Sequence, residues 1–465
     1  MPAPTHSRPA RRHRTHSKPA VRRPDRPAPV SALDAALTAS QQLPTPPPRT
    51  FAQLGLPNAV VSVLGRRGIA EPFAIQARAL PDALAGRDVL ARAQTGSGKT
   101  LAFGLPMLTR LAGDPSARRP QAPRGLVLVP TRELARQVAD ALEPISTVLG
   151  LRVTTVFGGA SMGKQIEALR RGVDVVVATP GRLMDLMERR SVRLDGVEIA
   201  VIDEADHMAD LGFLPAVTKI LDTTPSDRQC LLFSATLDRG VDKLVARYLA
   251  DPAIHAVAPA SASIELMDHQ VFVLAHEEKV NVAAQIAGRP ARTLFFVRTK
   301  HGADRLAKQL IRQGVDAAAI HGNLNQSQRQ RALDGFSSGR NRVLVATDVA
   351  ARGLHIDDVD LVVHFDPPND HKDYLHRSGR TARAGASGTV VSLVEPHQTT
   401  DVARIHTAAS IEPDRSNVSS NHPAVQRLAT SGEAITPPPA APVATRPQSA
   451  PRSTNRRRHY RRPTN

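Results

Sequence analysis

The sequence predicts an α/β fold in which two parallel-sheet domains follow one another along the chain. The chain has 465 residues, which is enough for two to three ordinary domains. Short apolar runs of strand length alternate with helical stretches in two successive series, as in parallel sheets covered by helices on both faces. A weakly patterned stretch at residues 256–268 separates the two series, and we interpret it as a linker.

The first domain is expected over residues 49–255 and the second over residues 269–412. The strand-like runs of the first series are DVLA (88–91), GLVLV (125–129), VTTVF (153–157), DVVVA (174–178), EIAVI (198–202) and QCLLF (229–233). Those of the second series are VFVLA (271–275), TLFFV (293–297), AAAI (317–320), RVLVA (342–346), LVVHF (361–365) and TVVSLV (389–394). Ligands of such sheets bind beyond the carboxyl ends of the strands, so functional residues are expected there.

The two ends of the chain are expected to be disordered, basic tails. Residues 1–48 and 413–465 are rich in Pro, Ala, Thr and Arg and poor in aromatic and branched apolar residues, so they cannot bury enough surface to offset chain entropy. They carry much of the formal net charge of +18. This composition fits a role in solubility and equally fits sequence-independent attraction to nucleic acid.

Cysteine usage and hydropathy indicate the compartment. Cys230 is the single cysteine, which excludes an internal disulfide and suits a reducing compartment. The sequence has no secretory leader and no apolar run of about 18 residues. We therefore expect a soluble, cytoplasmic protein without a membrane partner.

An apolar run that ends in two acids is the first sign of chemistry. EIAVIDEADHM places Asp203 and Glu204 side by side at the end of a buried strand, and desolvated carboxylates require a cation or hydrogen-bond donors. AQTGSGKT (93–100) follows another strand and opens a helix, which is the context of a phosphate loop. The expected phosphate-binding residues are Thr95, Gly96, Ser97, Gly98, Lys99 and Thr100.

These two segments predict a nucleoside triphosphate site with a magnesium ion. Lys99 would contact the β and γ oxygens, while Thr100 and Asp203 would bind Mg²⁺. Glu204 would orient and deprotonate the water that attacks the γ-phosphate. The competing interpretation, a helix cap rich in acids, fits Asp206 better than Asp203.

Further motifs follow in the order of a known family. They are PTRELA (130–135), GG (158–159), TPGR (179–182), SAT (234–236), FVRT (296–299), Gln326 with Arg329, ATDVAARG (346–353) and HRSGRTARAG (376–385). With DEAD at 203–206, the chain resembles the DEAD-box ATP-dependent RNA helicases over about residues 50–400. The resemblance implies two tandem RecA-like domains with ATP and single-stranded RNA bound across the cleft.

The resemblance also implies roles for residues around the nucleotide. Phe51 would stack on adenine, Gln76 would hydrogen-bond the adenine edge, and Gly353 would lie in the same site. Arg380 and Arg383 would reach the γ-phosphate from the second domain and neutralise charge in the transition state.

Four positions depart from the family pattern. Ile69 stands where the family usually has an aromatic residue, Phe73 where it has Thr, and Ala382 where it has Gly. His355 replaces an Asp that usually contacts the ribose. Because the charge of His varies near its ordinary pKa of about 6.5, we expect ATP affinity to be looser or pH-sensitive.

The remaining motifs are implied to contact the RNA backbone, which carries no sequence code. The residues are Thr131, Arg132, Gly159, Thr179, Gly181 and Arg182 in the first domain, and Arg298, Arg329 and Thr347 in the second. Ser234 and Thr236 would couple the carboxylate site to the RNA-bearing surface.

The resulting hypothesis is a monomeric, RNA-stimulated ATPase that closes over ATP and RNA. Closure would separate short RNA duplexes or remodel RNA–protein complexes. An ATP-gated RNA clamp and a basic RNA chaperone are alternatives, and a DNA helicase is a third. The sequence does not specify which RNA the protein binds, because roles in ribosome assembly, messenger turnover and cold adaptation fit it equally.

Overall fold

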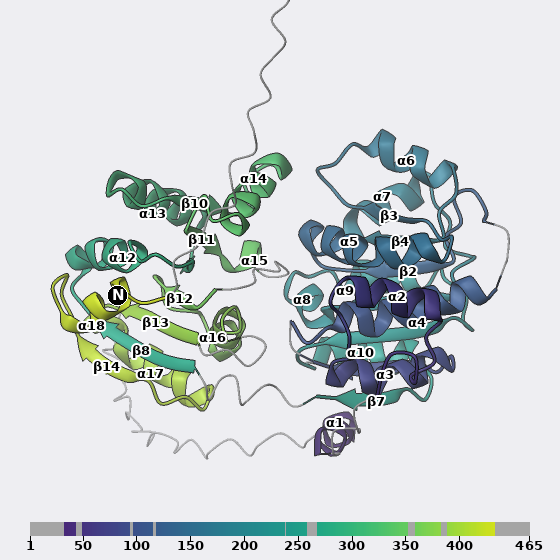
Figure 1. Ribbon diagram of the computed structural model, residues 1–465, viewed down its shortest axis with the longest axis horizontal. Helices are drawn as coiled ribbons and strands as arrows, with labels where there is room; N and C mark the ends of the chain where they lie inside the picture. The colour runs from purple at the N-terminus through teal and green to yellow at the C-terminus, as the bar shows by residue number, and fades with distance from the viewer. Residues whose placement is uncertain are drawn as a thin grey trace, which may run out of the picture.

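The computed structural model describes residues 32–42, 49–93, 96–114, 118–237, 239–257, 267–351, 359–382 and 388–432. Two α/β units lie side by side, the first on the right of Figure 1 and the second on the left. Each unit contains a seven-stranded sheet with helices packed on it. All pairs of neighbouring strands in both sheets are parallel, as the sequence predicts.

The first unit runs from α1 to β7. Its strands are β1 (Val89–Arg92), β2 (Gly125–Leu128), β3 (Val153–Val156), β4 (Val175–Ala178), β5 (Ile199–Asp203), β6 (Gln229–Ser234) and β7 (Ala253–Ala256). Its helices are α1 (Ala32–Gln42), α2 (Asn58–Arg66), α3 (Ala74–Leu84), α4 (Lys99–Gly113), α5 (Arg132–Val148), α6 (Met162–Arg170), α7 (Pro180–Glu188), α8 (Ala205–Asp210), α9 (Leu214–Leu221) and α10 (Arg239–Tyr248).

The second unit runs from β8 to α18. Its strands are β8 (Met267–Val273), β9 (Thr293–Val297), β10 (Ala317–Ile320), β11 (Val343–Thr347), β12 (Leu361–His364), β13 (Gly388–Val394) and β14 (Asp414–Asn417). Its helices are η1 (His276–Glu278), α12 (Lys279–Ala287), α13 (Lys300–Arg312), α14 (Gln326–Ser337), α15 (Asp348–Ala351), α16 (His371–Ser378), η2 (Pro396–Gln398), α17 (Thr399–Ala408) and α18 (Pro423–Ala429).

Local sequence explains where several elements begin and why they are buried. β5 reads IAVID and is buried along its whole length, as expected of a central parallel strand. Thr131 begins α5, because its side chain accepts a hydrogen bond from the Leu134 N–H at 3.2 Å. Asn325 begins α14 through a capping box with Gln328, which satisfies two backbone N–H groups that have no helical partner.

The order of the strands decides which loops meet. The first sheet has the order β3-β4-β2-β5-β6-β1-β7, so β3, β4 and β2 are neighbours, and β5, β6 and β1 follow next to them. The phosphate loop, DEAD and SAT follow β1, β5 and β6, whereas PTRELA, GG and TPGR follow β2, β3 and β4. Two groups of motifs therefore lie beside each other along one edge of the same sheet.

The amino-terminal boundary expected from the sequence is wrong, because α1 lies inside the segment expected to be disordered. Ser40 Oγ donates to the Ile254 carbonyl at 2.9 Å and accepts from the Ala256 N–H at 3.0 Å. Arg78 donates to the carbonyls of Ser40 and Ala256, both at 2.8 Å. These bonds fix α1 to edge strand β7. Local composition does not predict this helix, because its partners in β7 are more than 200 residues away in the sequence.

The carboxyl-terminal boundary at residue 412 is also wrong. β14 pairs in parallel with β8, and α18 contributes the buried Val425 and Leu428 to the core that also contains α12. β14 reads DRSN, without the kind of apolar run that predicted twelve of the other strands. The linker expected at 256–268 lies mainly in residues 258–266, outside the described residues, and β8 already begins at Met267.

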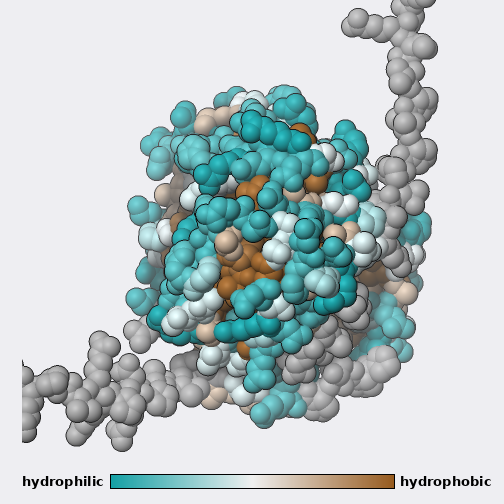
Figure 2. All heavy atoms as spheres, turned by 90° about the vertical axis from the view of Figure 1, so that its left-hand side faces the viewer, coloured by the Kyte–Doolittle hydropathy of each residue, from teal (hydrophilic) through white to brown (hydrophobic). Residues whose placement is uncertain are grey.

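Most of the outer face of the second unit is hydrophilic, with an apolar patch near the middle of the view in Figure 2. The large hydrophobic side chains exposed in the described part of the chain are Phe73, Val148, Ile311 and Val349. Scattered apolar residues on a surface are ordinary, and Phe73 is the aromatic one among them. No helix within the described ranges is both long and apolar enough to cross a membrane.

Candidate active site

The phosphate loop connects β1 to α4 through glycines in left-handed conformations. Gly96 has φ of 89° and Gly98 has φ of 84°, values that residues with a side chain rarely adopt. A Cβ at Gly98 would overlap Nε2 of Gln76. Lys99 opens α4 with 6% of its surface exposed, and its buried Nζ has no hydrogen-bond partner among the described residues. A buried ammonium of this kind fits an anion such as a phosphate oxygen. Thr95 lies outside the described residues.

Asp203 and Glu204 lie where the sequence predicts, at the carboxyl end of β5. Both are buried, and Glu204 has a left-handed backbone with φ of 52°. This conformation is costly for a residue other than glycine and is typical of functional sites. Asp203 accepts a hydrogen bond from the Glu204 N–H at 3.0 Å. His207 Nδ1 lies 3.2 Å from Oε2 of Glu204. His207 is not among the residues predicted from the sequence, although its position three residues after Glu204 on a short helix is a signal of this contact.

The two neighbouring carboxyl groups differ in their ionisation. Burial raises the pKa of Asp203 to about 7, against the opposing charge of Lys99. Burial also acts to raise the pKa of Glu204, but the hydrogen bond from His207 and the charges of Lys99 and Arg380 outweigh it and hold that pKa below its usual range. The surroundings therefore favour the charged form of Glu204, whereas a cation beside Asp203 would offset the effect of burial and favour its charged form.

Ser234 and Thr236 contact the DEAD segment through Asp206. The Asp206 N–H donates to Ser234 Oγ at 3.2 Å, and Oδ2 of Asp206 accepts from both the N–H and Oγ1 of Thr236 at 2.9 Å. Ser234 Oγ in turn donates to the Thr236 carbonyl at 2.7 Å. Asp206, an acid in the first turn of α8, therefore connects α8 to the end of β6 through hydrogen bonds.

The two residues expected to contact the nucleotide base, Phe51 and Gln76, are both buried. Phe51 is 1% exposed and belongs to the core of the first unit, so its stacking on adenine stays a prediction that requires the ring to become accessible. Gln76 is 2% exposed, and both ends of its amide have protein partners. Its Oε1 accepts from the Phe73 N–H at 2.9 Å, and its Nε2 donates to the Gly98 carbonyl at 3.0 Å. The contact of Gln76 with the base stays a prediction, and it would require Gln76 to replace one of these two hydrogen bonds with a bond to the base.

Arg380 of the second unit lies near enough to the acidic site for its charge to act on Glu204. It follows α16, is 5% exposed, and its charge contributes to the lowered pKa of Glu204. The neighbouring Arg377 is occupied elsewhere, since it forms two hydrogen bonds to Asp348 at 2.6 and 2.8 Å. Arg383, Gly353 and His355 lie outside the described residues.

Arg329 has a partner that differs from the predicted RNA backbone. Its Nε donates to Oε1 of Glu133 at 2.7 Å, from α14 of the second unit to α5 of the first. Gln326 donates to the same oxygen at 3.2 Å, and Arg136 donates to Gln330 at 2.7 Å. Arg329 therefore forms a cross-domain ion pair in this structure, and its RNA contact stays a prediction. Glu133 was missed because its partner is 196 residues away.

The predicted RNA contacts of the first unit gather beyond β2, β3 and β4. Arg132 packs over the GG turn, where a Cβ at Gly159 would overlap its Nη1. Arg182 Nη1 donates to the Ala160 carbonyl and to Gln165, both at 3.3 Å. Thr131 and Thr179 occupy the N-cap positions of α5 and α7, and Gly181 lies in the open first turn of α7.

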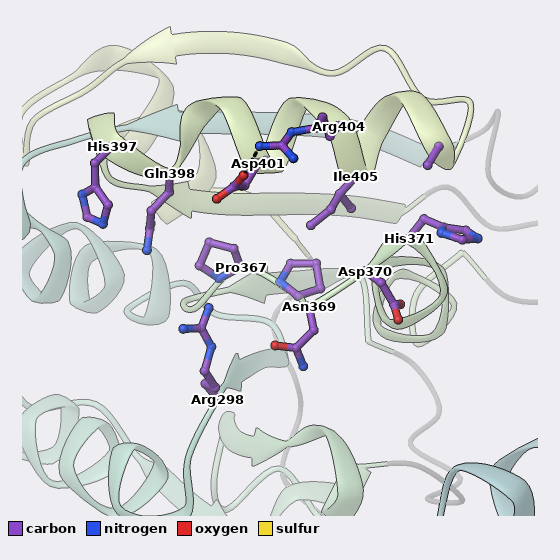
Figure 3. A pocket seen from close by; sticks show the side chains of 13 residues that line it. Arg298, Pro367, Asn369, Asp370, His371, His397, Gln398, Asp401, Arg404 and Ile405 are labelled. Atoms are coloured by element: carbon purple, nitrogen blue, oxygen red, sulfur yellow. Dashed lines mark hydrogen bonds and ion pairs between the residues drawn. The ribbon is translucent and has the colours of Figure 1, made fainter. Parts of the chain in front are cut away.

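The predicted RNA contacts of the second unit are more dispersed. Thr347 ends β11 and is nearly buried, whereas Arg298 follows β9 and is exposed. Arg298 lines a cavity of about 660 Å³ between α17 and the segment that joins β12 to α16. Figure 3 shows its side chain facing this cavity, with Asp401 and Arg404 of α17 on the opposite wall.

The donor set near the loop suits magnesium bound largely through phosphate and water. No group of three or more His, Cys, Asp or Glu side chains that could hold a metal occurs in the described ranges. Magnesium commonly takes only one or two protein ligands when it binds with a nucleotide. The raised pKa of buried Asp203 and the unpartnered Lys99 Nζ therefore fit a magnesium–triphosphate pair.

Together these features define a two-domain protein of the phosphate-loop class, with an acidic strand end in one domain and an approaching arginine in the other. Comparison with known proteins gives the family. DEAD/DEAH box helicase matches residues 73–244, and Helicase conserved C-terminal domain matches residues 278–385. RNA helicase CrhR of Synechocystis sp. is 41% identical over 350 residues, which cover 75% of this chain and 70% of CrhR. The chain belongs to the DEAD-box helicase family, which confirms the resemblance seen in its motifs.

Two further proteins extend the comparison. DEAD-box ATP-dependent RNA helicase 30 of Arabidopsis thaliana is 42% identical over 346 residues, which cover 74% of this chain but only 58% of that relative. The structure of S. cerevisiae Dbp5 bound to RNA and ADP BeF3 matches with a TM-score of 0.72 and 29% identity, covering 82% of this chain and 100% of Dbp5. The expected pair of RecA-like domains is thus confirmed at the level of the fold.

Proposed function

We propose that this protein is an RNA-stimulated ATPase that couples ATP binding and hydrolysis to local separation of short RNA duplexes or remodelling of RNA–protein complexes. The observation that carries the proposal is that the charges of Lys99 and Arg380, from two different domains, both act on buried Glu204. A catalytic site divided in this way is complete only when the domains are together. Hydrolysis can therefore depend on any ligand that favours the closed arrangement.

The residues of the first domain account for binding and for proton transfer. Lys99 and the glycine turn bind the phosphates, and ionised Glu204 accepts a proton from the attacking water. Thr100 and Asp203 are the residues that would hold Mg²⁺, which when bound offsets the charge of the phosphate oxygens. Arg380 neutralises negative charge as the γ-phosphoryl group departs.

RNA is the ligand that would favour closure. Backbone-binding candidates lie beyond β2, β3 and β4, beside α5, and α5 carries the Glu133 that pairs with Arg329 of the second domain. A single strand held across both domains would therefore stabilise the same state that assembles the ATP site, so RNA and ATP should strengthen each other's binding. The names of the relatives and the RNA-bound Dbp5 structure support RNA as the substrate class.

The cellular setting is part of the proposal. We place the protein in the cytoplasm as a monomer, which agrees with its single buried cysteine. Ribosomal or RNA-turnover assemblies are compatible partners.

The test is ATP hydrolysis by the full chain with single-stranded RNA, with single-stranded DNA and without nucleic acid, together with displacement of a short RNA duplex. We expect stimulation by RNA above DNA, and displacement that requires ATP. Stimulated hydrolysis without displacement would favour an ATP-gated clamp. ATP-independent activity that disappears when residues 1–31 and 433–465 are removed, with α1 and α18 kept, would favour a chaperone.

A further inference from the structure

An exposed aromatic ring lies directly against the phosphate loop. Phe73 is 56% exposed, and its Cδ2 would be 2.7 Å from a Cβ placed on Gly98. Only a glycine at position 98 leaves room for the ring in this place. The ring therefore borders the turn that opens α4, immediately before Lys99.

Backbone contacts fix the segment that carries the Phe73 ring. Phe73 is the N-cap residue of α3, with an extended backbone, and its N–H donates to Gln76 Oε1 at 2.9 Å. The other end of that amide is bonded to the Gly98 carbonyl at 3.0 Å. The backbone of Phe73, the amide of Gln76 and the loop are thus joined before any ligand binds, which lowers the entropy cost of presenting the ring beside the loop.

Other side chains near the loop cannot provide an aromatic face. Phe51 is buried in the core, as are Phe103 and Phe233, whose rings contact each other edge to face at 5.4 Å. Ile69 is aliphatic and packs against the same core. Among the described residues around the loop, Phe73 has the accessible ring.

We propose that Phe73 forms the stacking wall for the base of the nucleotide, a role that rests on the proposed ATPase function. Most of the ring surface faces solvent, where it gains nothing from packing, and a flat base laid on it would remove apolar area of both partners from water. Every base has a π face, so stacking adds affinity without selecting adenine. Selection of adenine would stay with hydrogen bonds such as those expected of Gln76.

The decisive comparison separates the base from the phosphates. Binding of ATP, GTP and inorganic tripolyphosphate is measured for the full native chain and for Phe73→Leu. We expect Phe73→Leu to weaken ATP and GTP alike, by about 5- to 100-fold, while tripolyphosphate binding stays unchanged. Val148→Ala removes another exposed apolar side chain of the same domain and should leave all three affinities unchanged.

A direct readout is available because the chain contains no tryptophan. Phe73→Trp creates a single tryptophan at the proposed wall, and its fluorescence should change on addition of ATP but not of tripolyphosphate. Equal ATP affinity of Phe73→Leu and the native chain would overturn the proposal, as would an equal loss for tripolyphosphate, which would mean that Phe73 acts by shaping the loop. If the native chain itself does not bind ATP, the proposed function fails instead.

Discussion

Arg329 and Glu133 form a buried ion pair between the two domains, with 2.7 Å between Nε and Oε1. Arg329 belongs to α14 of the second domain and Glu133 to α5 of the first, so the pair joins two helices that pack on different sheets. Breaking one partner of a buried pair leaves an uncompensated charge, which costs more than the pair itself contributes. The pair can therefore stabilise the closed arrangement only while both residues are present.

Removing either partner should uncouple ATP from RNA. We expect Glu133→Gln or Arg329→Met to reduce the mutual strengthening of ATP and RNA binding by roughly 5- to 100-fold, because closure loses its charged contact. RNA affinity with and without a non-hydrolysable ATP analogue measures this coupling. Arg136→Ala is the control, since its cross-domain bond to Gln330 is exposed and should contribute little. Unchanged coupling in Glu133→Gln would contradict the role of the pair.

Glu204→Gln should abolish hydrolysis while binding is retained. The amide keeps the size of the side chain but cannot take a proton from water, so we expect kcat to fall by about 10²- to 10⁴-fold. Steady-state hydrolysis and equilibrium binding of ATP and RNA provide the measurements. Glu188→Gln, at the exposed end of α7, should behave as the native protein. Normal turnover by Glu204→Gln would remove Glu204 from the role of base.

Thr236→Val should impair strand separation more than ATP binding. The change keeps the shape of the side chain and the backbone bond to Asp206, but it removes the Oγ1 bond of 2.9 Å to that carboxylate. We expect displacement of a short RNA duplex to fall roughly tenfold, because a hydrogen bond to a charged group contributes about 1.5–3 kcal/mol. Thr223→Val removes a comparable bond to the Ile220 carbonyl outside the site and serves as the control. A parallel loss of ATP affinity would contradict a coupling role.

The stability of the second domain should fall at mildly acidic pH because of His406. Burial lowers its pKa to about 4, helped by the charges of Arg415 and His269, and its ring lies edge to face with Tyr374 at 4.8 Å. In the unfolded chain the pKa is about 6.5. Between these values the unfolded chain takes up a proton that the folded chain does not, so the free energy of unfolding decreases as pH falls from about 6.5 to 4.

His406→Phe should weaken this pH dependence. Both ring nitrogens of His406 are buried without a hydrogen-bond partner among the described residues, so replacing them with carbon should stabilise the domain by about 1–2 kcal/mol at pH 5. Denaturant unfolding at pH 7 and pH 5 measures the effect. His397→Phe, at an exposed site, should leave both values unchanged. A variant with the same acid sensitivity as the native chain would show that another group is responsible.

Local sequence was sufficient for the features that depend on neighbouring residues. The apolar runs predicted twelve strands, and all twelve occur with ends that shift by a few residues. The acids at the end of β5 and the loop before Lys99 were predictable because each depends on consecutive residues: an apolar run that ends in acids, and a glycine-rich turn that ends in a lysine. The same local signals failed for β14, whose polar sequence forms a strand only because it pairs with β8.

The sequence by itself determined the family, the two α/β domains and the residues of the phosphate loop and acidic strand end. Tertiary structure alone decided that Phe51 is core while Phe73 is exposed, that His207 contacts Glu204, and that Arg329 faces Glu133. The physical reason is that burial and pairing are set by neighbours in space. Glu133 and Arg329 are 196 residues apart in the chain, and nothing in either local sequence specifies the other.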